Sequence, residues 1–185
     1  MTNDVVFDQD LRARIVKNLD QHEVRESDTE GLIRASVCLI ILDSDNSVHG
    51  YDESAAKFGA EQRLKLMSDI PGIREDDTLT GSIEGTAGGA AVLLTRRGAR
   101  LKDHPGQWAL PGGRVDGSET SLDAAMREAH EEVGLKLSAA NFLGRLDDYS
   151  TRSGYVISPF VFWIEDGVEP IANPDEVASI HRVSI

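Results

Sequence analysis

The sequence predicts a single mixed α/β domain over residues 1–185, with one mixed sheet, flanking helices and an insertion in the first half. Three observations predict it. A length of 185 residues suits one domain. Helical periodicity occurs within residues 1–33 and again within residues 113–135, and short aliphatic runs bounded by turn residues separate the two.

The first expected element is an amphipathic helix over Asp8–Glu23. Phe7 precedes it and is placed to act as a hydrophobic staple at the helix entry. The apolar residues recur at helical spacing, and they are Leu11, Ile15, Val16 and Leu19. This periodicity predicts that one side of the helix packs on a core.

Two buried strands are expected next, at Arg34–Leu42 and at Ala90–Arg97. The segment between them is too long for a hairpin loop, so residues 43–89 are interpreted as an insertion between two paired strands. Within the insertion, Ala55–Met67 has helical character and Gly81–Gly89 is typical of a loop.

The second half predicts a Gly/Pro-rich loop and then a strong helix. The elements expected from there on are a helix at Thr120–Val133, strands at Asn141–Tyr149 and Tyr155–Ile164, a loop at Glu165–Pro174 and a strand at Ala178–Val183. The sequence stops at Ser184–Ile185 in apolar material. We therefore expect a truncated chain, or a sheet face covered by the N-terminal helix or by a second subunit in a homodimer.

The charge balance excludes two classes of partner. The chain has 19 basic and 32 acidic residues, a net charge of −13. Such a surface repels nucleic-acid phosphates and anionic membranes, so neither partner is expected. An anionic substrate would need a source of positive charge at the site, and a metal ion is the obvious candidate.

Cysteine usage and the N-terminus predict a compartment. Cys38 is the single cysteine, which excludes an internal disulfide framework, and it is expected to be a small buried hydrophobe. Residues 1–10 have neither a basic nor an apolar region of the signal-peptide kind, and no apolar run approaches the ~18 residues of a membrane span. We expect a reducing, cytoplasmic location.

The segment 113–135 carries the chemistry. On a helical projection its apolar residues form one stripe, and Glu128, Glu131 and Glu132 gather on another side. Carboxylates at this spacing repel one another, so something should offset the repulsion. A solvated acidic face is the simple alternative to a cation site.

The loop before this helix favours the cation site. Gly112, Gly113 and Gly117 let the backbone turn sharply or approach a ligand, and Ser118 or Thr120 can cap the helix. Gly134 suits the end of the helix. A glycine-rich loop that leads into a carboxylate-lined helix is a reasonable platform for a hard divalent cation.

These residues resemble the Nudix box, GX5EX7REUXEEXGU, where U is aliphatic. The match comprises Gly113, Glu119, Arg127, Glu128, Glu131, Glu132, Gly134 and Leu135, and the one departure is Ala129 at an aliphatic position. The resemblance implies the Nudix fold, a mixed sheet sandwiched between helices. It also implies Mg²⁺- or Mn²⁺-dependent hydrolysis of a small-molecule substrate in which a nucleoside diphosphate is linked to another group.

Site roles follow from the same resemblance. Glu128 and Glu132 would be the principal metal ligands, with Glu131 a further ligand or a carboxylate that orients water. Arg127 and Glu119 would pair to hold the loop against the helix. Nudix enzymes often recruit another acid from the loop before the last strand, and Glu176 is expected there as a ligand or general base.

The segment 93–113 is similar to the motif that precedes the box in coenzyme A diphosphatases. The residues that agree are Leu93, Leu94, Thr95, Arg97, Gly106, Pro111, Gly112 and Gly113. Gly98, Lys102 and Leu110 depart from it, and Lys102 lacks the planar fork that suits bidentate phosphate contacts. The segment 150–161 is also similar to that subfamily.

This likeness implies hydrolysis of coenzyme A or an acyl derivative to 3′,5′-ADP and a 4′-phosphopantetheine product. Gly112 and Gly113 would approach the substrate. The basic cluster of Arg96, Arg97, Arg100 and Lys102 is either a patch that binds the 3′-phosphate or a solvated strand end. The alternatives are an ADP-ribose or nucleotide-sugar diphosphatase and a non-catalytic binding module with the same fold.

Overall fold

The computed structural model describes residues 5–49, 88–98, 101, 106–165 and 167–185. The helix expected at Ala55–Met67 and the basic residues Arg100 and Lys102 lie outside this part of the chain.

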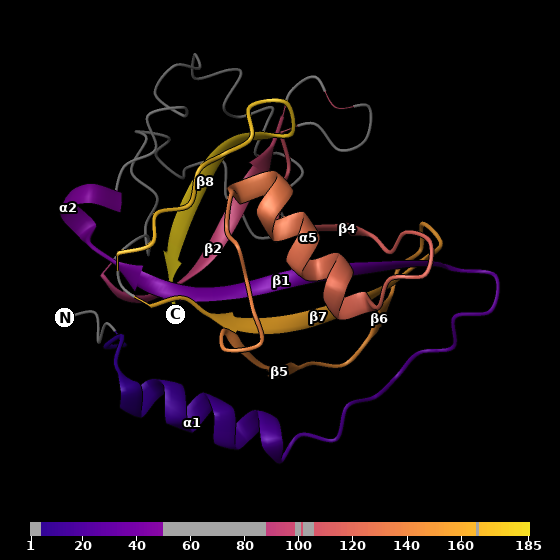
Figure 1. Ribbon diagram of the computed structural model, residues 1–185, viewed down its shortest axis with the longest axis horizontal. Coiled ribbons are helices and arrows are strands. Elements are labelled where there is room, and N and C mark those ends of the chain that lie inside the picture. Colours follow the sequence, from indigo (N-terminus) through magenta and orange to yellow (C-terminus); the bar gives the residue numbers. More distant parts are fainter. Residues whose placement is uncertain (1–4, 50–87, 99–100, 102–105, 166) are drawn as a thin grey trace, which may run out of the picture.

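The described strands form one mixed sheet of eight strands (Figure 1). They are β1 (Ile33–Ser44), β2 (Gly89–Arg97), β3 (Trp108–Ala109), β4 (Gly112–Arg114), β5 (Phe142–Arg145), β6 (Tyr149–Ser150), β7 (Tyr155–Trp163) and β8 (Val177–Ser184). The order along the main path is β3-β2-β1-β7-β5, with β4 on β1, β6 on β7 and β8 on β2. β1 and β7 run parallel, and the other pairs are antiparallel.

The helices are α1 (Gln9–Asp20), α2 (Asn46–His49) and α5 (Ser121–Val133). Alternate residues of β1 belong to two different cores. Cys38 and Ile40 pack with apolar residues of α5, whereas Leu39 and Ile41 pack with apolar residues of α1. Because successive side chains of a strand point to opposite faces, α1 and α5 cover opposite faces of the sheet. The predicted sheet between helices is confirmed.

The N-terminal helix begins as expected but its entry is held differently. The Asp8 side chain accepts a hydrogen bond from the backbone N–H of Leu11 at 2.7 Å and caps the helix. The expected staple within the helix is wrong. The Phe7 ring stacks on the indole of Trp163 with centroids 4.0 Å apart, so it holds the helix entry against β7. The fourth helical residue, Arg12, offers no apolar partner for a staple.

The two strands around the insertion pair as predicted. β1 and β2 are antiparallel, from Ile41 opposite Val92 to Ser44 opposite Gly89. Ser44 and Gly89, where the two strands meet the insertion, therefore lie opposite each other in the sheet.

Two expected elements differ in the structure. The single strand expected at Asn141–Tyr149 is divided into β5 and β6. Between them the backbone N–H of Asp148 donates to the carbonyl oxygen of Arg25 and not to β7, and Pro159 of β7, opposite this gap, has no N–H to donate. The Gly/Pro-rich segment before α5 is not only a loop, since it contains β3 and β4. β4 approaches β1 so closely that a Cβ on Gly112 would collide with the backbone of Ser36 and Val37.

Within the described residues, no helix has the length and apolar character needed to cross a membrane. A homodimer stays a prediction.

Candidate functional site

Helix α5 begins and ends at residues that the sequence marks. The Thr120 hydroxyl accepts from the backbone N–H of Asp123, and the Asp123 carboxylate accepts from the backbone N–H of Thr120, a reciprocal cap. Thr120 rather than Ser118 is therefore the capping residue. At the other end Gly134 has φ 70°, the left-handed conformation that glycine adopts without strain. The helix projects its carboxylates from a fixed frame.

Glu132 is the buried carboxylate of this frame, with 6% of its surface exposed. Its Oε2 accepts a hydrogen bond from the backbone N–H of Gly112 at 3.1 Å. The pKa of Glu132 is raised to about 7, chiefly by burial and in smaller part by the negative charges of Glu128 and Glu176, while the hydrogen bond from Gly112 and the positive charge of Arg97 oppose the rise. A carboxylate in this environment gains from a nearby cation.

Glu128 lies one turn before Glu132 and packs over β4. A Cβ built on Gly113 would overlap the Glu128 carboxylate, so the missing side chain of Gly113 makes the space that this carboxylate occupies. Burial raises the pKa of Glu128, Arg127 lowers it, and the charges of Glu131 and Glu176 raise it. Gly112 and Gly113 thus support the carboxylates of the helix.

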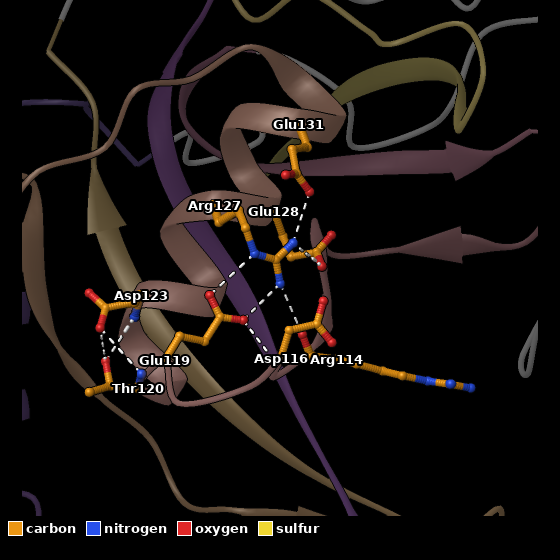
Figure 2. A network of polar contacts seen from close by, with 8 residues as sticks. All are labelled: Arg114, Asp116, Glu119, Thr120, Asp123, Arg127, Glu128 and Glu131. Carbon is orange, nitrogen blue, oxygen red and sulfur yellow. Dashed lines mark hydrogen bonds and ion pairs between the residues drawn. The ribbon is translucent and has the colours of Figure 1, made fainter.

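Arg127 is the centre of the polar network in Figure 2. Its Nε and Nη2 donate to the two carboxylate oxygens of Glu119 at 3.2 and 3.0 Å, and its Nη1 donates to Glu128 at 2.9 Å and to Glu131 at 2.8 Å. Nη2 also donates to the backbone carbonyl of Arg114 at 3.0 Å. The side chain of Arg114 itself points away from the cluster (Figure 2). One guanidinium therefore joins the loop to the helix.

The partners of Arg127 change its acidity and that of Glu119. The hydrogen bond from Arg127 holds the pKa of Glu119 below its usual value, and the backbone N–H of Asp116 adds to this effect. The Glu119 carboxylate in turn raises the pKa of Arg127, so the guanidinium stays charged. Part of the repulsion among the helix carboxylates is thereby offset.

Glu176 is brought to the carboxylates by the loop that precedes β8. The backbone N–H of Asn173 donates to the carbonyl oxygen of Glu132 at 2.9 Å, and the carbonyl oxygen of Glu176 accepts from the N–H of Gly98 at 2.7 Å. Glu176 lies near enough for its charge to raise the pKa values of Glu128 and Glu132.

The two described arginines of the basic cluster do not share a face. Arg96 lies opposite Trp108 on β3, is 7% exposed, and places its guanidinium 5.4 Å from the Trp108 ring centroid. Its neighbour Arg97 points to the α5 side, where its positive charge lowers the pKa of Glu132. The structure therefore brings Arg97, and not Arg96, to the carboxylates.

The residues present fit a divalent cation in donor type and charge. Hard cations prefer carboxylate oxygens, and Glu128 and Glu132 are acids whose pKa values burial raises and a cation would lower. In the present arrangement Arg127 takes part of this role. Among the residues that the structure describes, no three carboxylate, imidazole or thiol side chains stand close enough together to hold an ion.

Sequence reasoning missed two residues at this site. Ser36, on β1, lies opposite Gly113, and Asn173 holds the turn before Glu176. Neither belongs to a sequence pattern, although Asn173 precedes a proline and is thus typical of a turn.

Comparisons with known proteins bear on this arrangement. Residues 83–185, more than half of the chain, match the family described as NUDIX domain. The protein named Uncharacterized Nudix hydrolase NudL from Yersinia enterocolitica is 39% identical over 95 residues, which cover 51% of this chain and 49% of that protein. The protein of the same name from Photorhabdus laumondii is 41% identical over 95 residues, or 51% of each chain. The matched region thus spans about half the length of these relatives.

Solved structures agree on the fold. A MutT/nudix family protein from Enterococcus faecalis has a TM-score of 0.53 at 18% identity, covering 93% of this chain and 50% of that one. A bifunctional NMN adenylyltransferase/ADP ribose pyrophosphatase from Francisella tularensis, solved with AMP and a manganese ion, has a TM-score of 0.50 at 15% identity, covering 95% of this chain and 39% of that one. At these identities the likeness concerns the fold alone. With its sheet, its glycine-supported acidic helix and its match over residues 83–185, the chain belongs to the Nudix family.

Proposed function

We propose that this chain is a divalent-cation-dependent hydrolase of the diphosphate bond in a nucleoside diphosphate linked to another group. The observation that carries the proposal is the placement of Glu128 and Glu132 one turn apart on α5. Both carboxylates lie against the glycines of β4. Two acidic side chains, one turn apart and partly buried against these glycines, would offer a divalent cation two carboxylate ligands.

Four carboxylates are the proposed ligands. Glu128 and Glu132 would hold Mg²⁺ or Mn²⁺, with Glu131 and Glu176 as further ligands or as groups that orient the attacking water. A bound divalent cation would polarise the phosphoryl oxygens and acidify the attacking water. Glu176, whose charge lies near enough to raise the pKa of Glu132, would then accept a proton from that water.

Arg127 and Glu119 would position these groups without touching the substrate. Their paired hydrogen bonds join the loop that contains Glu119 to the helix that contains Glu128 and Glu131. Because catalysis depends on groups held in place before the reaction, this pair would act by preorganisation.

The proposed substrate is coenzyme A or an acyl derivative, which would give 3′,5′-ADP and a 4′-phosphopantetheine product. The likeness of residues 93–113 to the coenzyme A diphosphatase motif supports it. Arg97 is the described member of the basic cluster that faces the α5 side, and we propose it as a phosphate contact together with Arg100 and Lys102. A charge-assisted contact with the 3′-phosphate would be worth roughly 1.5–3 kcal/mol.

The test is a substrate panel on one enzyme preparation with Mg²⁺ and with Mn²⁺. It comprises coenzyme A, 3′-dephospho-coenzyme A, ADP-ribose and a nucleotide sugar. We expect kcat/KM for coenzyme A to exceed that for the dephosphorylated form by about ten- to a hundredfold. A preference for ADP-ribose by more than about tenfold would reject the coenzyme A assignment, and no turnover of any substrate would favour a binding module.

A matched variant tests the role of the carboxylates. Glu132→Gln keeps the shape and the acceptor that binds the N–H of Gly112 but removes the charge. We expect the variant to unfold at the same temperature as the wild type or higher, since a buried acid is removed, while kcat falls by orders of magnitude. Near-normal turnover at limiting Mg²⁺ would contradict the proposal.

A further inference from the structure

The Ser36 hydroxyl is a buried polar group with no hydrogen-bond partner among the residues that the structure describes. Ser36 is 0% exposed, and its Oγ makes no hydrogen bond to any of these residues. A buried hydroxyl without a partner costs free energy, so most such groups in proteins are hydrogen-bonded. The exception at Ser36 calls for a physical account.

The neighbours of Ser36 on β1 show which way it faces. Arg34 Nη2 donates to the Ser121 hydroxyl at 2.6 Å, and Cys38 Sγ donates to the carbonyl oxygen of Ala125 at 2.9 Å. Both partners belong to α5. Because residues two apart in a strand share a face, Ser36 also faces α5.

The strand register places Ser36 beside Glu128. Ser36 lies directly opposite Gly113 in the antiparallel β1–β4 pair. Positions paired in this way have Cβ atoms about 4.5–5.5 Å apart, and the Cβ position of Gly113 is occupied by the Glu128 carboxylate. Burial is the main cause that raises the pKa of the Cys38 thiol, and the negative charges of Glu132 and Glu128 raise it further. The effect of these charges agrees with the placement of both carboxylates over β1.

We propose that Ser36 is a positioning residue for Glu128, whose hydroxyl donates a hydrogen bond to the Glu128 carboxylate when that carboxylate takes a divalent cation. This inference rests on the proposed function. Among the described residues, Arg127 donates a hydrogen bond to the Oε1 atom of Glu128. A carboxylate has about four acceptor positions, so it can accept from Ser36 and bind an ion as well.

The proposed hydrogen bond would need a rotation of the Ser36 side chain about χ1. The three staggered rotamers of serine move Oγ while the backbone stays in place. A hydrogen bond from a neighbour fixes the orientation of a ligand, and loss of such a partner typically weakens metal binding by about 10–100-fold. In this proposal the Ser36 hydroxyl is the hydrogen-bond donor that Glu128 gains when the cation binds.

The experiment measures Mn²⁺ binding to the full chain without substrate, by electron paramagnetic resonance, together with the unfolding temperature. For Ser36→Ala we expect Mn²⁺ binding about tenfold weaker and an unfolding temperature unchanged or higher, because the variant removes an unpaired buried hydroxyl. A purely structural serine would not give this combination. Ser36→Cys keeps a weak donor, and we expect its loss of affinity to be smaller.

Two control variants separate the possible outcomes. Ser158→Ala removes the neighbouring hydroxyl on β7, which is already bonded to Asp148 at 2.7 Å, and should lower stability without changing Mn²⁺ binding. Glu128→Gln tests the proposed function itself. If Glu128→Gln weakens binding while Ser36→Ala and Ser36→Cys bind as the wild type does, the role of Ser36 is overturned. If Glu128→Gln has no effect, the proposed function fails instead.

Discussion

The backbone N–H of Asn173 donates to the carbonyl oxygen of Glu132 at 2.9 Å, so one residue joins the loop of Glu176 to the helix of Glu128. The carbonyl oxygen of Asn173 accepts from the N–H groups of Glu176 and Val177 at 3.1 and 2.8 Å. The Asn173 side chain accepts from the N–H of Asp175 at 3.1 Å, which closes the turn. The position of Glu176 thus depends on a turn that is itself anchored on the helix.

The first prediction concerns this turn. Asn173→Ala removes the side-chain acceptor for Asp175, and Asn173→Asp retains one. We expect kcat to fall about tenfold in the alanine variant with a smaller change in KM, and we expect Asn173→Asp to restore most of the rate. Steady-state kinetics with saturating Mg²⁺ check this. Equal kcat in the wild type and the alanine variant would show that the turn does not need the side chain.

The frame of this site follows from local signals in the sequence. Thr120, Asp123 and Gly134 mark the ends of α5, and its apolar stripe at 3.6-residue spacing marks the buried side. The long strands also follow from their aliphatic runs, since β1 and β7 each begin within a residue of the predicted positions. Local chemistry determines these elements, so local patterns predict them.

The remaining contacts depend on residues far apart in the chain. The pairing of β4 with β1 and the contact of Phe7 with Trp163 join segments that no local pattern relates. Strand alternation implies that Arg96 and Arg97 face opposite sides, but only the packing of α5 tells which side holds the carboxylates. Ser36 has no sequence signal because its position opposite Gly113 depends on the pairing of two strands far apart in the chain.

The second prediction concerns Arg127. Arg127→Lys keeps the charge but loses the planar fork that binds both oxygens of Glu119. Because the arginine is 30% exposed and part of its electrostatic gain is screened, we expect a loss of about 1 kcal/mol in the free energy of unfolding. Urea denaturation measures it. Arg127→Ala should lose more, since Glu128 and Glu131 then lack a cation, and a lysine variant as stable as the wild type would contradict the argument.

The third prediction concerns Gly113. Gly113→Ala places a methyl group where the Glu128 carboxylate lies, so the carboxylate must move. We expect weaker Mn²⁺ binding and a lower kcat, with little loss of stability because the end of the Glu128 side chain can turn away. Titration with Mn²⁺ in the absence of substrate checks the first of these effects.

Gly117→Ala is the matched control for Gly113→Ala. Gly117 has φ 52° and no atom within 4 Å of its Cβ position. Alanine there strains the backbone, at a cost of about 1 kcal/mol, and leaves the carboxylates alone. We expect this control to lose stability and keep its metal affinity. The same affinity loss in both variants would mean that loop strain, rather than contact with Glu128, explains the effect.

The last prediction concerns Asp148, whose side chain is 4% exposed. Burial alone would raise its pKa, but hydrogen bonds from Arg145, Ser158 and the N–H of Ser27 together hold the pKa below its usual value. Since the folded-state pKa lies below the unfolded-state pKa, the charged carboxylate stabilises the fold above about pH 4, and this contribution is lost as the pH falls through the folded-state pKa.

Asp148→Asn should therefore lower the free energy of unfolding by about 2 kcal/mol at pH 7. The difference from the wild type should shrink below about pH 4, which urea denaturation between pH 3 and pH 7 would measure. Asp147→Asn, at a neighbouring carboxylate with 39% of its side chain exposed, should show a smaller loss. A difference for Asp148→Asn that does not change with pH would mean that the lost packing, and not the charge, explains the destabilisation.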